Sequence, residues 1–100
     1  MPPVVRGVRF EWNATKARSN LSKHKISFLD ATEIFRDDFM LEQLEEPSHS
    51  EHRHRAIGVA DSRILFIVFT FRGDCIRLIS ARKATRHETV RYWKNRLLRA

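Results

Sequence analysis

The stretch Ile64 to Phe71 limits most strongly what this chain can fold into, because seven of its eight residues are apolar. It is rich in β-branched and aromatic residues, so it predicts a strand inside a sheet that is covered on both faces. Arg72-Gly73-Asp74 then predicts a tight turn, and Cys75 to Arg82 a strand that pairs back as a hairpin. One hundred residues is the size of one compact domain, so we assign residues 1–100 to a single domain.

The N-terminal part of the chain predicts one strand and two helices. Residues 8–12 alternate between apolar and polar side chains, as a short strand does. Asn13 is a good N-cap for a helix over residues 14–24. Ser27 and Asp30 resemble a capping box, which predicts a second helix that ends at Asp37-Asp38.

Strands and a final helix are predicted for the rest of the chain. Besides the hairpin, residues 39–44 and 53–60 have strand patterns. Thr85 and Glu88 form a capping box that opens a helix to the C-terminus, with an apolar stripe of Val90, Trp93 and Leu97. We expect Trp93 in the core. The order β-α-α-β-β-β-β-α, with short connections, predicts an α+β fold with an antiparallel sheet, two N-terminal helices and a C-terminal helix.

The positive charge of the chain is concentrated near its C-terminus. The formal net charge is +7, and residues 1–71 balance ten Lys and Arg with ten Asp and Glu. Residues 72–100 hold nine Lys and Arg against only Asp74 and Glu88, whereas residues 30–51 hold eight acids against Arg36. Such polarity favours a polyanion or an acidic protein as partner, although net charge also serves solubility.

Two arginines lie within the last predicted strand. Strict alternation places Arg77 and Arg82 on opposite faces, unless a backbone bend near the strand end turns Arg82. One such arginine could bond an acid, for example Glu42 or Glu51, while its stem covers the core.

Arg53 and Arg55 lie on one face of the strand predicted over residues 53–60. Several arginines near one sheet face repel each other unless an anion lies among them. The guanidinium fork matches phosphate oxygens. The arginines together therefore predict a phosphate-binding cleft.

Histidines and one lysine are the candidates for proton transfer. His49, His52 and His54 are interleaved with acids and arginines, and their spacing matches no metal-ligand signature, so we expect no metal site. One of them could act as a general acid or base, or all could lie in a solvated loop. Lys23 and His24 end the first predicted helix, where they could simply favour the helix dipole or hold a phosphate.

The C-terminal helix mixes basic and aromatic side chains: Arg86, Arg91, Lys94, Arg96 and Arg99 surround Tyr92 and Trp93. This mixture suits RNA, whose unstacked bases lie on aromatic rings, and it equally suits an acidic protein partner. The chain has no long apolar run for a membrane span and no signal-peptide pattern, and Cys75 is its one cysteine. We expect a cytoplasmic protein without an internal disulfide.

Three separated motifs carry a resemblance to a known family. They are FEWNATKARSNLSKH, then the segment EHRHRAIG, then IRLISARKATRHE, and they occur in the family's order. The sequence resembles the BrnT family of type II toxin–antitoxin toxins, small ribonucleases with a RelE-like fold, from about Phe10 to Tyr92. It departs from the family at Lys25, where glycine is usual and a helix C-cap is affected, and at Asp37-Asp38, where Asp-Pro is common.

The resemblance implies metal-independent RNA cleavage without a cofactor, in which the 2′-hydroxyl attacks the adjacent phosphate. It also implies inhibition by a BrnA-type antitoxin with a ribbon-helix-helix DNA-binding domain, in a heterotetramer with two toxins that contacts operator DNA through the antitoxin. A basic RNA- or DNA-binding module without catalysis is the alternative, and a purely structural interaction protein is a third reading.

Roles for individual residues follow from what this reaction requires. Arg77 and Arg82, assisted by Arg53, are expected to stabilise the phosphorane. The candidates for proton transfer are Lys23, His24, Glu51 and His49, among which the sequence does not choose. The expected RNA contacts are Arg55, Lys83, Arg86, Arg91 and Tyr92.

Overall fold

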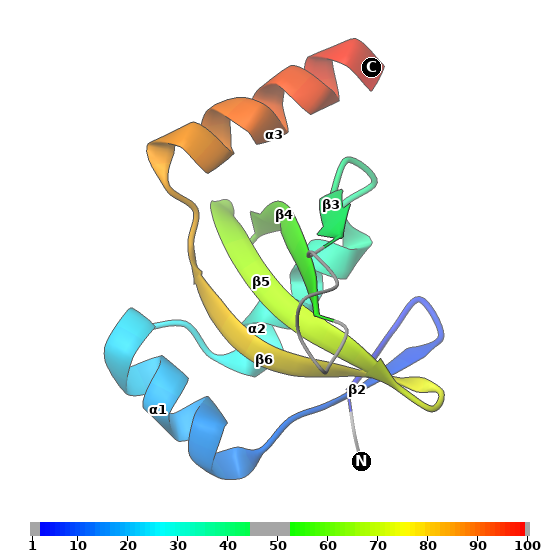
Figure 1. The fold of residues 1–100 in the computed structure, drawn as a ribbon, viewed down its shortest axis with the longest axis vertical. Coiled ribbons are helices and arrows are strands. Elements are labelled where there is room, and N and C mark those ends of the chain that lie inside the picture. The colour runs from blue at the N-terminus through cyan, green and yellow to red at the C-terminus, as the bar shows by residue number, and fades with distance from the viewer. Residues whose placement is uncertain (1–2, 45–52, 100) are drawn as a thin grey trace.

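The computed structural model describes residues 3–44 and 53–99 (Figure 1). The elements follow in the order β1 (Val4–Val5), β2 (Val8–Glu11), α1 (Ala14–His24), α2 (Phe28–Ala31), the 3-10 helix η1 (Thr32–Arg36), β3 (Leu41–Leu44), β4 (His54–Ala60), β5 (Arg63–Arg72), β6 (Cys75–Lys83) and α3 (Arg86–Arg99). The predicted α+β class is confirmed. None of the helices in the described ranges is long and apolar enough to cross a membrane.

The strands form one mixed sheet in the order β1-β2-β6-β5-β4-β3. β3 to β6 pair as an antiparallel meander, and β1 pairs antiparallel with β2. β2, however, runs parallel to β6, with Glu11 opposite Arg77. The prediction of a purely antiparallel sheet is therefore wrong. Between β2 and the meander the chain passes through α1, α2 and η1, and it enters the sheet again at the opposite edge, with β3.

The first hairpin, β1 to β2, is not part of the order predicted from the sequence. Arg6 and Gly7 form its two-residue turn, and both have positive φ angles, 51° and 80°. Two such residues suit the right-handed twist of a hairpin. The sequence does carry a signal for this turn, a glycine between two short apolar runs, but β1 has only two residues.

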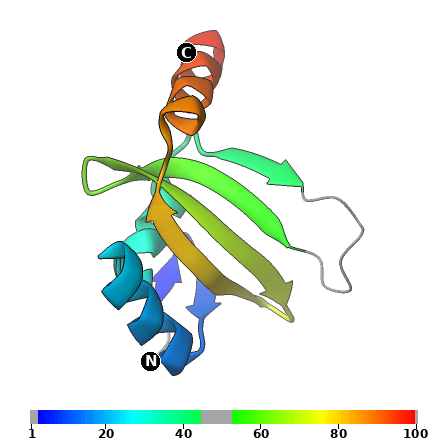
Figure 2. The same cartoon turned by 60° about the vertical axis from the view of Figure 1, so that its left-hand side comes forward.

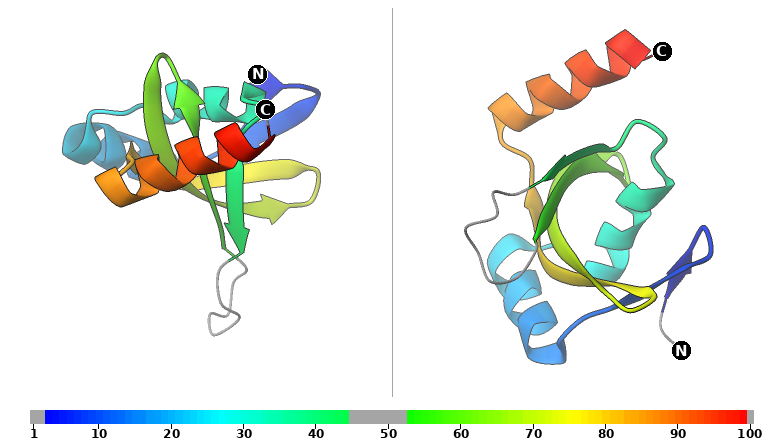
Figure 3. Two further views of the ribbon diagram at one scale, coloured as in Figure 1. Left: turned by 90° about the horizontal axis from the view of Figure 1, so that it is seen from above. Right: turned by 45° about the vertical axis from the view of Figure 1, so that its right-hand side comes forward.

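The main core lies between one sheet face and the segment α2–η1, around which the sheet curves (Figure 3, right). Phe10, Ile34, Leu65, Ile67 and Leu78 are fully buried there. A smaller cluster of Ile57, Phe66 and Tyr92 lies on the opposite face of the sheet, under α3. β5 was predicted to be covered on both faces of the sheet, but the cover is only partial, since Ile64 and Val68 are half-buried and Phe71 is exposed.

The second predicted helix begins at Ser27 but is mostly a 3-10 helix. The Ser27 hydroxyl accepts the Asp30 N–H at 3.0 Å, as the capping pattern predicted. One α-helical turn later, the Thr32 hydroxyl donates to the Leu29 carbonyl at 2.6 Å and competes there with the helix backbone. Gly58 lets η1 approach β4 closely, because a Cβ at that position would lie 2.9 Å from the Cβ of Ile34.

The two remaining helices have the predicted caps. The Asn13 side chain accepts the Lys16 N–H at 3.0 Å, and Lys25 ends α1 in the left-handed conformation, with φ 62°. At α3, the Thr85 N–H donates to Glu88 at 2.8 Å and the Glu88 N–H to the Thr85 hydroxyl at 3.2 Å.

The predicted buried stripe of α3 is wrong. Val90 and Trp93 are 44% exposed and Leu97 is 75% exposed, whereas Tyr92 has no exposed surface. Figures 1 and 2 show α3 at one end of the sheet, which it contacts with a single face. Tyr92 is buried on that face, and one turn later Asn95 donates to the Phe39 carbonyl at 3.4 Å and the Arg96 guanidinium lies 4.8 Å from the centre of the Phe39 ring. Trp93 therefore lies outside the core.

Candidate functional site

An irregularity in β6 decides where the arginines point. Val68 lies opposite Ser80 and Phe69 opposite Leu78, so Ile79 is an extra residue that has no partner on β5. Such a bulge reverses the alternation of side chains beyond it. Leu78 and Ala81 consequently both enter the main core, although they are three residues apart.

The bulge brings Arg77 and Arg82 to the same face of the sheet. Arg77 lies opposite Thr70 and Arg82 opposite Phe66, and residues 66 and 70 share one face of β5, which has no extra residue. The prediction from strict alternation, which placed the two arginines on opposite faces, is therefore wrong.

The sheet face opposite the main core is strongly basic. Arg55 of β4 lies opposite Val68 of β5 and so belongs to this face, and Arg53 lies two residues before Arg55. Arg9 of β2 and Arg72 of β5 are both register partners of Cys75 and join the face from its neighbouring strands. We call the following set the arginine face: Arg9, Arg53, Arg55, Arg72, Arg77 and Arg82.

Arg77 is held by a carboxylate from the neighbouring strand. Its Nη1 donates to Glu11 Oε2 at 2.6 Å, and both side chains are part-exposed. The acid that pairs with this arginine is therefore Glu11 and not Glu42, whose carboxylate lies 3.0 Å from His54 Nδ1. A guanidinium has five N–H donors, so this contact leaves Arg77 able to bind an anion.

Arg82 is held by the first turn of α3. Its Nη1 and Nη2 donate to the two oxygens of Glu88 at 2.8 and 2.9 Å, and its guanidinium lies 4.1 Å from the centre of the Phe66 ring. Burial alone would raise the pKa of Glu88, but the hydrogen bonds from Arg82 and the Thr85 N–H hold that pKa below its usual value. One carboxylate thus caps the helix and orients the arginine.

Lys23 and His24 lie beside the bulge and not among the arginines. With Lys16, Ser19, Asn20, Ile79 and Ser80 they line a pocket of about 200 Å³ between α1 and β6, which we call the α1 pocket. Arg53 and Arg55 are exposed on the arginine face. His49, His52 and Glu51 fall outside the described residues. His54 belongs to the opposite face, where its ring stacks on Phe69.

Tyr92 anchors α3 and is unavailable to RNA. Its hydroxyl donates to Asp37 Oδ2 at 2.6 Å, and Asp37 also accepts the backbone N–H groups of Val59 and Phe39 at 2.9 Å each. Burial and the neighbouring Asp37 raise the pKa of Tyr92. The predicted RNA contact of Tyr92 is wrong for this structure, because a ring without exposed surface cannot stack on a base.

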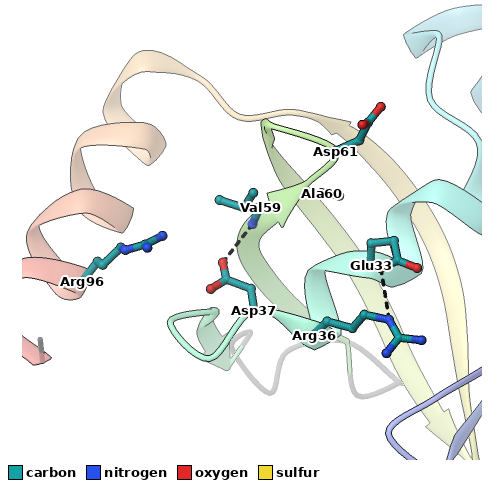
Figure 4. Close-up of a pocket in the computed structure, with 7 residues that line it drawn as sticks. All are labelled: Glu33, Arg36, Asp37, Val59, Ala60, Asp61 and Arg96. Atoms are coloured by element: carbon teal, nitrogen blue, oxygen red, sulfur yellow. Dashed lines mark hydrogen bonds and ion pairs between the residues drawn. The ribbon is translucent and has the colours of Figure 1, made fainter.

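A second hollow, of about 290 Å³, lies beside this anchor (Figure 4). Three acids and two arginines line it: Glu33, Asp37, Asp61, Arg36 and Arg96. Figure 4 shows Arg96 reaching from α3 toward Asp37, and the opposite charges nearly cancel, so this hollow is a poorer anion site than the arginine face. Lys83 and Arg86 are exposed at the junction of β6 and α3, and Arg91 is half-buried on α3.

Residues 12–88 match the family described as the ribonuclease toxin BrnT of type II toxin–antitoxin systems. The match covers well over half of the chain. The chain belongs to the BrnT family. It is therefore a ribonuclease toxin of a type II toxin–antitoxin system, with RNA as its target and a protein antitoxin as its partner. A search among curated proteins gave no match.

The span that matches the BrnT family includes both arginines of β6, the α1 pocket and Glu88. The sequence alone does not identify Glu11 and Glu88 as site residues. The sequence identifies Glu88 as a helix cap, but the hydrogen bonds from Arg82 to Glu88 are seen only in the structure. Glu11 cannot be paired with Arg77 without the parallel contact of β2 and β6. No group of three or more His, Cys, Asp or Glu residues suited to a metal occurs within residues 3–44 and 53–99.

Proposed function

We propose that this toxin cleaves RNA on the arginine face without a metal ion, by attack of the 2′-hydroxyl on the adjacent phosphate. The observation that carries the proposal is the bulge in β6, which directs Arg77 and Arg82 to one face. Cleavage of cellular RNA in this way would block translation in the cytoplasm.

The reaction forms a bond from the 2′-oxygen to phosphorus and breaks the bond from phosphorus to the 5′-oxygen. A base takes the proton of the 2′-hydroxyl, and the departing 5′-oxygen receives a proton. The products are a 2′,3′-cyclic phosphate and a 5′-hydroxyl. Extra negative charge develops on the phosphorane oxygens, so preorganised cations lower the barrier.

Arg77 and Arg82 suit this task because each is oriented before RNA binds. Three of the N–H donors of Arg82 are used by Glu88 and the Lys83 carbonyl, which leaves two for a phosphate. Arg53 and Arg55, both exposed, would bind flanking phosphates. For proton transfer, Glu11 joins the candidates His49 and Glu51, because its carboxylate lies on the arginine face, whereas the earlier candidates Lys23 and His24 line the α1 pocket.

The test is cleavage of a defined single-stranded RNA by the purified toxin in EDTA. We expect products that end in a 2′,3′-cyclic phosphate, and loss of cleavage in the double variant Arg77→Ala, Arg82→Ala. Arg6→Ala is the matched control, since Arg6 also pairs with an acid, Asp38 at 2.7 Å, but lies at the β1–β2 turn. Full activity of the double variant would refute the site. RNA binding without any cleavage would favour a non-catalytic module.

We also propose that a BrnA-type antitoxin with a ribbon-helix-helix domain binds α3, in a complex of two toxins and two antitoxins that contacts operator DNA through the antitoxin. The exposed side chains Val90, Trp93 and Leu97 recur at helical spacing, and Lys94 and Arg99 lie next to them. An apolar stripe beside cations fits an acidic amphipathic segment. Light scattering of the co-expressed complex would measure the stoichiometry.

A further inference from the structure

We propose that the α1 pocket binds a second phosphate of the RNA chain, next to the one held by Arg77 and Arg82. The proposal rests on the proposed function, since it extends the RNA site of the arginine face around the edge of the sheet. It assigns Lys16, Lys23 and His24 to substrate binding rather than to proton transfer.

The pocket exists because β2 leaves the sheet early. β2 pairs with β6 only as far as Arg77, so no strand of the described residues covers that edge of β6 beyond this point. Asn20 of α1 takes that place. Its side-chain amide donates to the Ala81 carbonyl at 2.8 Å and accepts the Ala81 N–H at 3.1 Å, and it also donates to the Ile26 carbonyl at 3.0 Å.

The anchor at Asn20 directs two lysines and a histidine to one place. Asn20 is only 7% exposed, so the helix face on which it lies is turned toward β6. Lys16, Lys23 and His24 lie four residues before and three and four residues after it, which places them on the same side of the helix. They line the pocket together with Ser19 and Ser80, residues whose hydroxyl groups are able to donate to phosphate oxygens.

The charge of the pocket has no counterpart within the described residues. None of the carboxylates in residues 3–44 and 53–99 lines the pocket. Over the same ranges, Lys16, Lys23 and His24 form no ion pair, in contrast to Arg77 and Arg82, each of which has a glutamate. Cations that share a small pocket without an acid favour an anion there, and lysine binds phosphate as a point charge.

Ser80 joins the two sites. It lines the α1 pocket, and it lies opposite Val68, which places its side chain on the arginine face between Arg77 and Arg82 in sequence. A nucleotide chain bound to those arginines would therefore continue over Ser80 to Lys23. This path explains why a basic pocket without an acid accompanies the bulge.

Steady-state cleavage of two substrates tests the proposal. One is a single-stranded RNA of eight nucleotides and the other a dinucleotide, which has only the phosphate that is cleaved. For Lys16→Ala, Lys23→Ala we expect KM for the longer RNA to rise on the order of tenfold with kcat unchanged. The dependence of log KM on log salt should weaken by about 0.7 for each phosphate that the variant no longer neutralises. KM for the dinucleotide should not change.

Arg18→Ala is the matched control, because Arg18 is an exposed cation of the same helix that does not line the α1 pocket. Unchanged KM and salt dependence in the double variant would overturn the proposal while leaving the ribonuclease intact. A fall in kcat on both substrates would overturn it in favour of proton transfer by Lys23. Weaker antitoxin binding with unchanged cleavage would overturn it in favour of the protein partner.

A failure of the ribonuclease proposal can be distinguished from a failure of the α1 pocket proposal. If the wild-type toxin cleaves neither substrate, fluorescence anisotropy with the same labelled RNA measures phosphate binding directly. Weaker binding and a smaller salt slope in the double variant would support the pocket, and equal binding would refute it.

Discussion

The arginine face and helix α3 are both basic, but the structure treats their charges in different ways. On the arginine face, Arg77 and Arg82 are each fixed by a glutamate, and Arg82 also lies on the Phe66 ring. On α3, Lys94 and Arg99 are exposed, without an ion pair to any described residue, beside apolar side chains that are also exposed. Fixed cations serve chemistry that depends on geometry, whereas exposed cations beside an apolar stripe serve the docking of a partner.

The largest effect is expected on the arginine face. Arg82→Ala should lower kcat about 10²- to 10³-fold, the usual cost of removing one preorganised charge from a transition state. Arg99→Ala, on α3, should leave kcat within a factor of about 2, since an exposed charge distant from the reaction contributes little. Single-turnover cleavage of a labelled RNA measures both. Equal losses of kcat for the two variants would show that the arginine face and α3 do not differ in their contribution to catalysis.

The next effect concerns α3 and the antitoxin. Trp93→Ala should weaken antitoxin binding by about 30-fold, equivalent to about 2 kcal/mol, because large aromatic residues dominate such interfaces. Cleavage by the free toxin should be unchanged. Calorimetric titration with the purified antitoxin provides the affinity, and Leu29→Ala is a control because Leu29 is 57% exposed on another part of the surface. Unaltered affinity for the Trp93 variant would place the antitoxin elsewhere.

A smaller effect is expected where α3 is anchored. Tyr92→Phe removes the hydroxyl that donates to Asp37, while both backbone donors to Asp37 remain. The free energy of unfolding should fall by about 1 kcal/mol, as is usual for a hydrogen bond whose partner keeps other donors. Urea denaturation measures this change. If cleavage falls together with stability, the anchor and the arginine face are coupled through α3.

Local signals in the sequence are sufficient for most elements, and they fail where the fold depends on distant contacts. Asn13, Ser27 and Thr85 are identified as caps because a cap depends on residues within one helical turn. The parallel pairing of β2 with β6 joins residues more than sixty positions apart, so no local sequence pattern predicts it. The exposure of Trp93 depends on which face of α3 is turned toward the sheet, and that face carries Tyr92 and Arg96.

The same distinction applies to the candidate site. The arginine content of the chain predicts a phosphate site, but strict alternation places Arg77 and Arg82 on opposite faces of the sheet. They lie on the same face only because β6 contains a bulge. The bulge at Ile79 could be suspected from the apolar residues Ile76, Leu78 and Ala81, whose spacing changes from two to three. The partner of Arg77 could not, since Glu11 comes from a strand that precedes both N-terminal helices.

The smallest effect concerns Glu88, the residue that belongs to both regions. Its pKa in the folded protein lies below its usual value, so its charged form stabilises the fold above the unfolded pKa of about 4.3, and that contribution is lost as the pH falls through the folded pKa. Glu88→Gln should therefore be less stable than the wild type by up to about 1 kcal/mol at pH 7, and the difference should shrink below about pH 4. Thermal unfolding from about pH 3 to about pH 7, at constant ionic strength, measures it. Parallel curves for the two proteins would show that Glu88 contributes no charge-dependent link between α3 and Arg82.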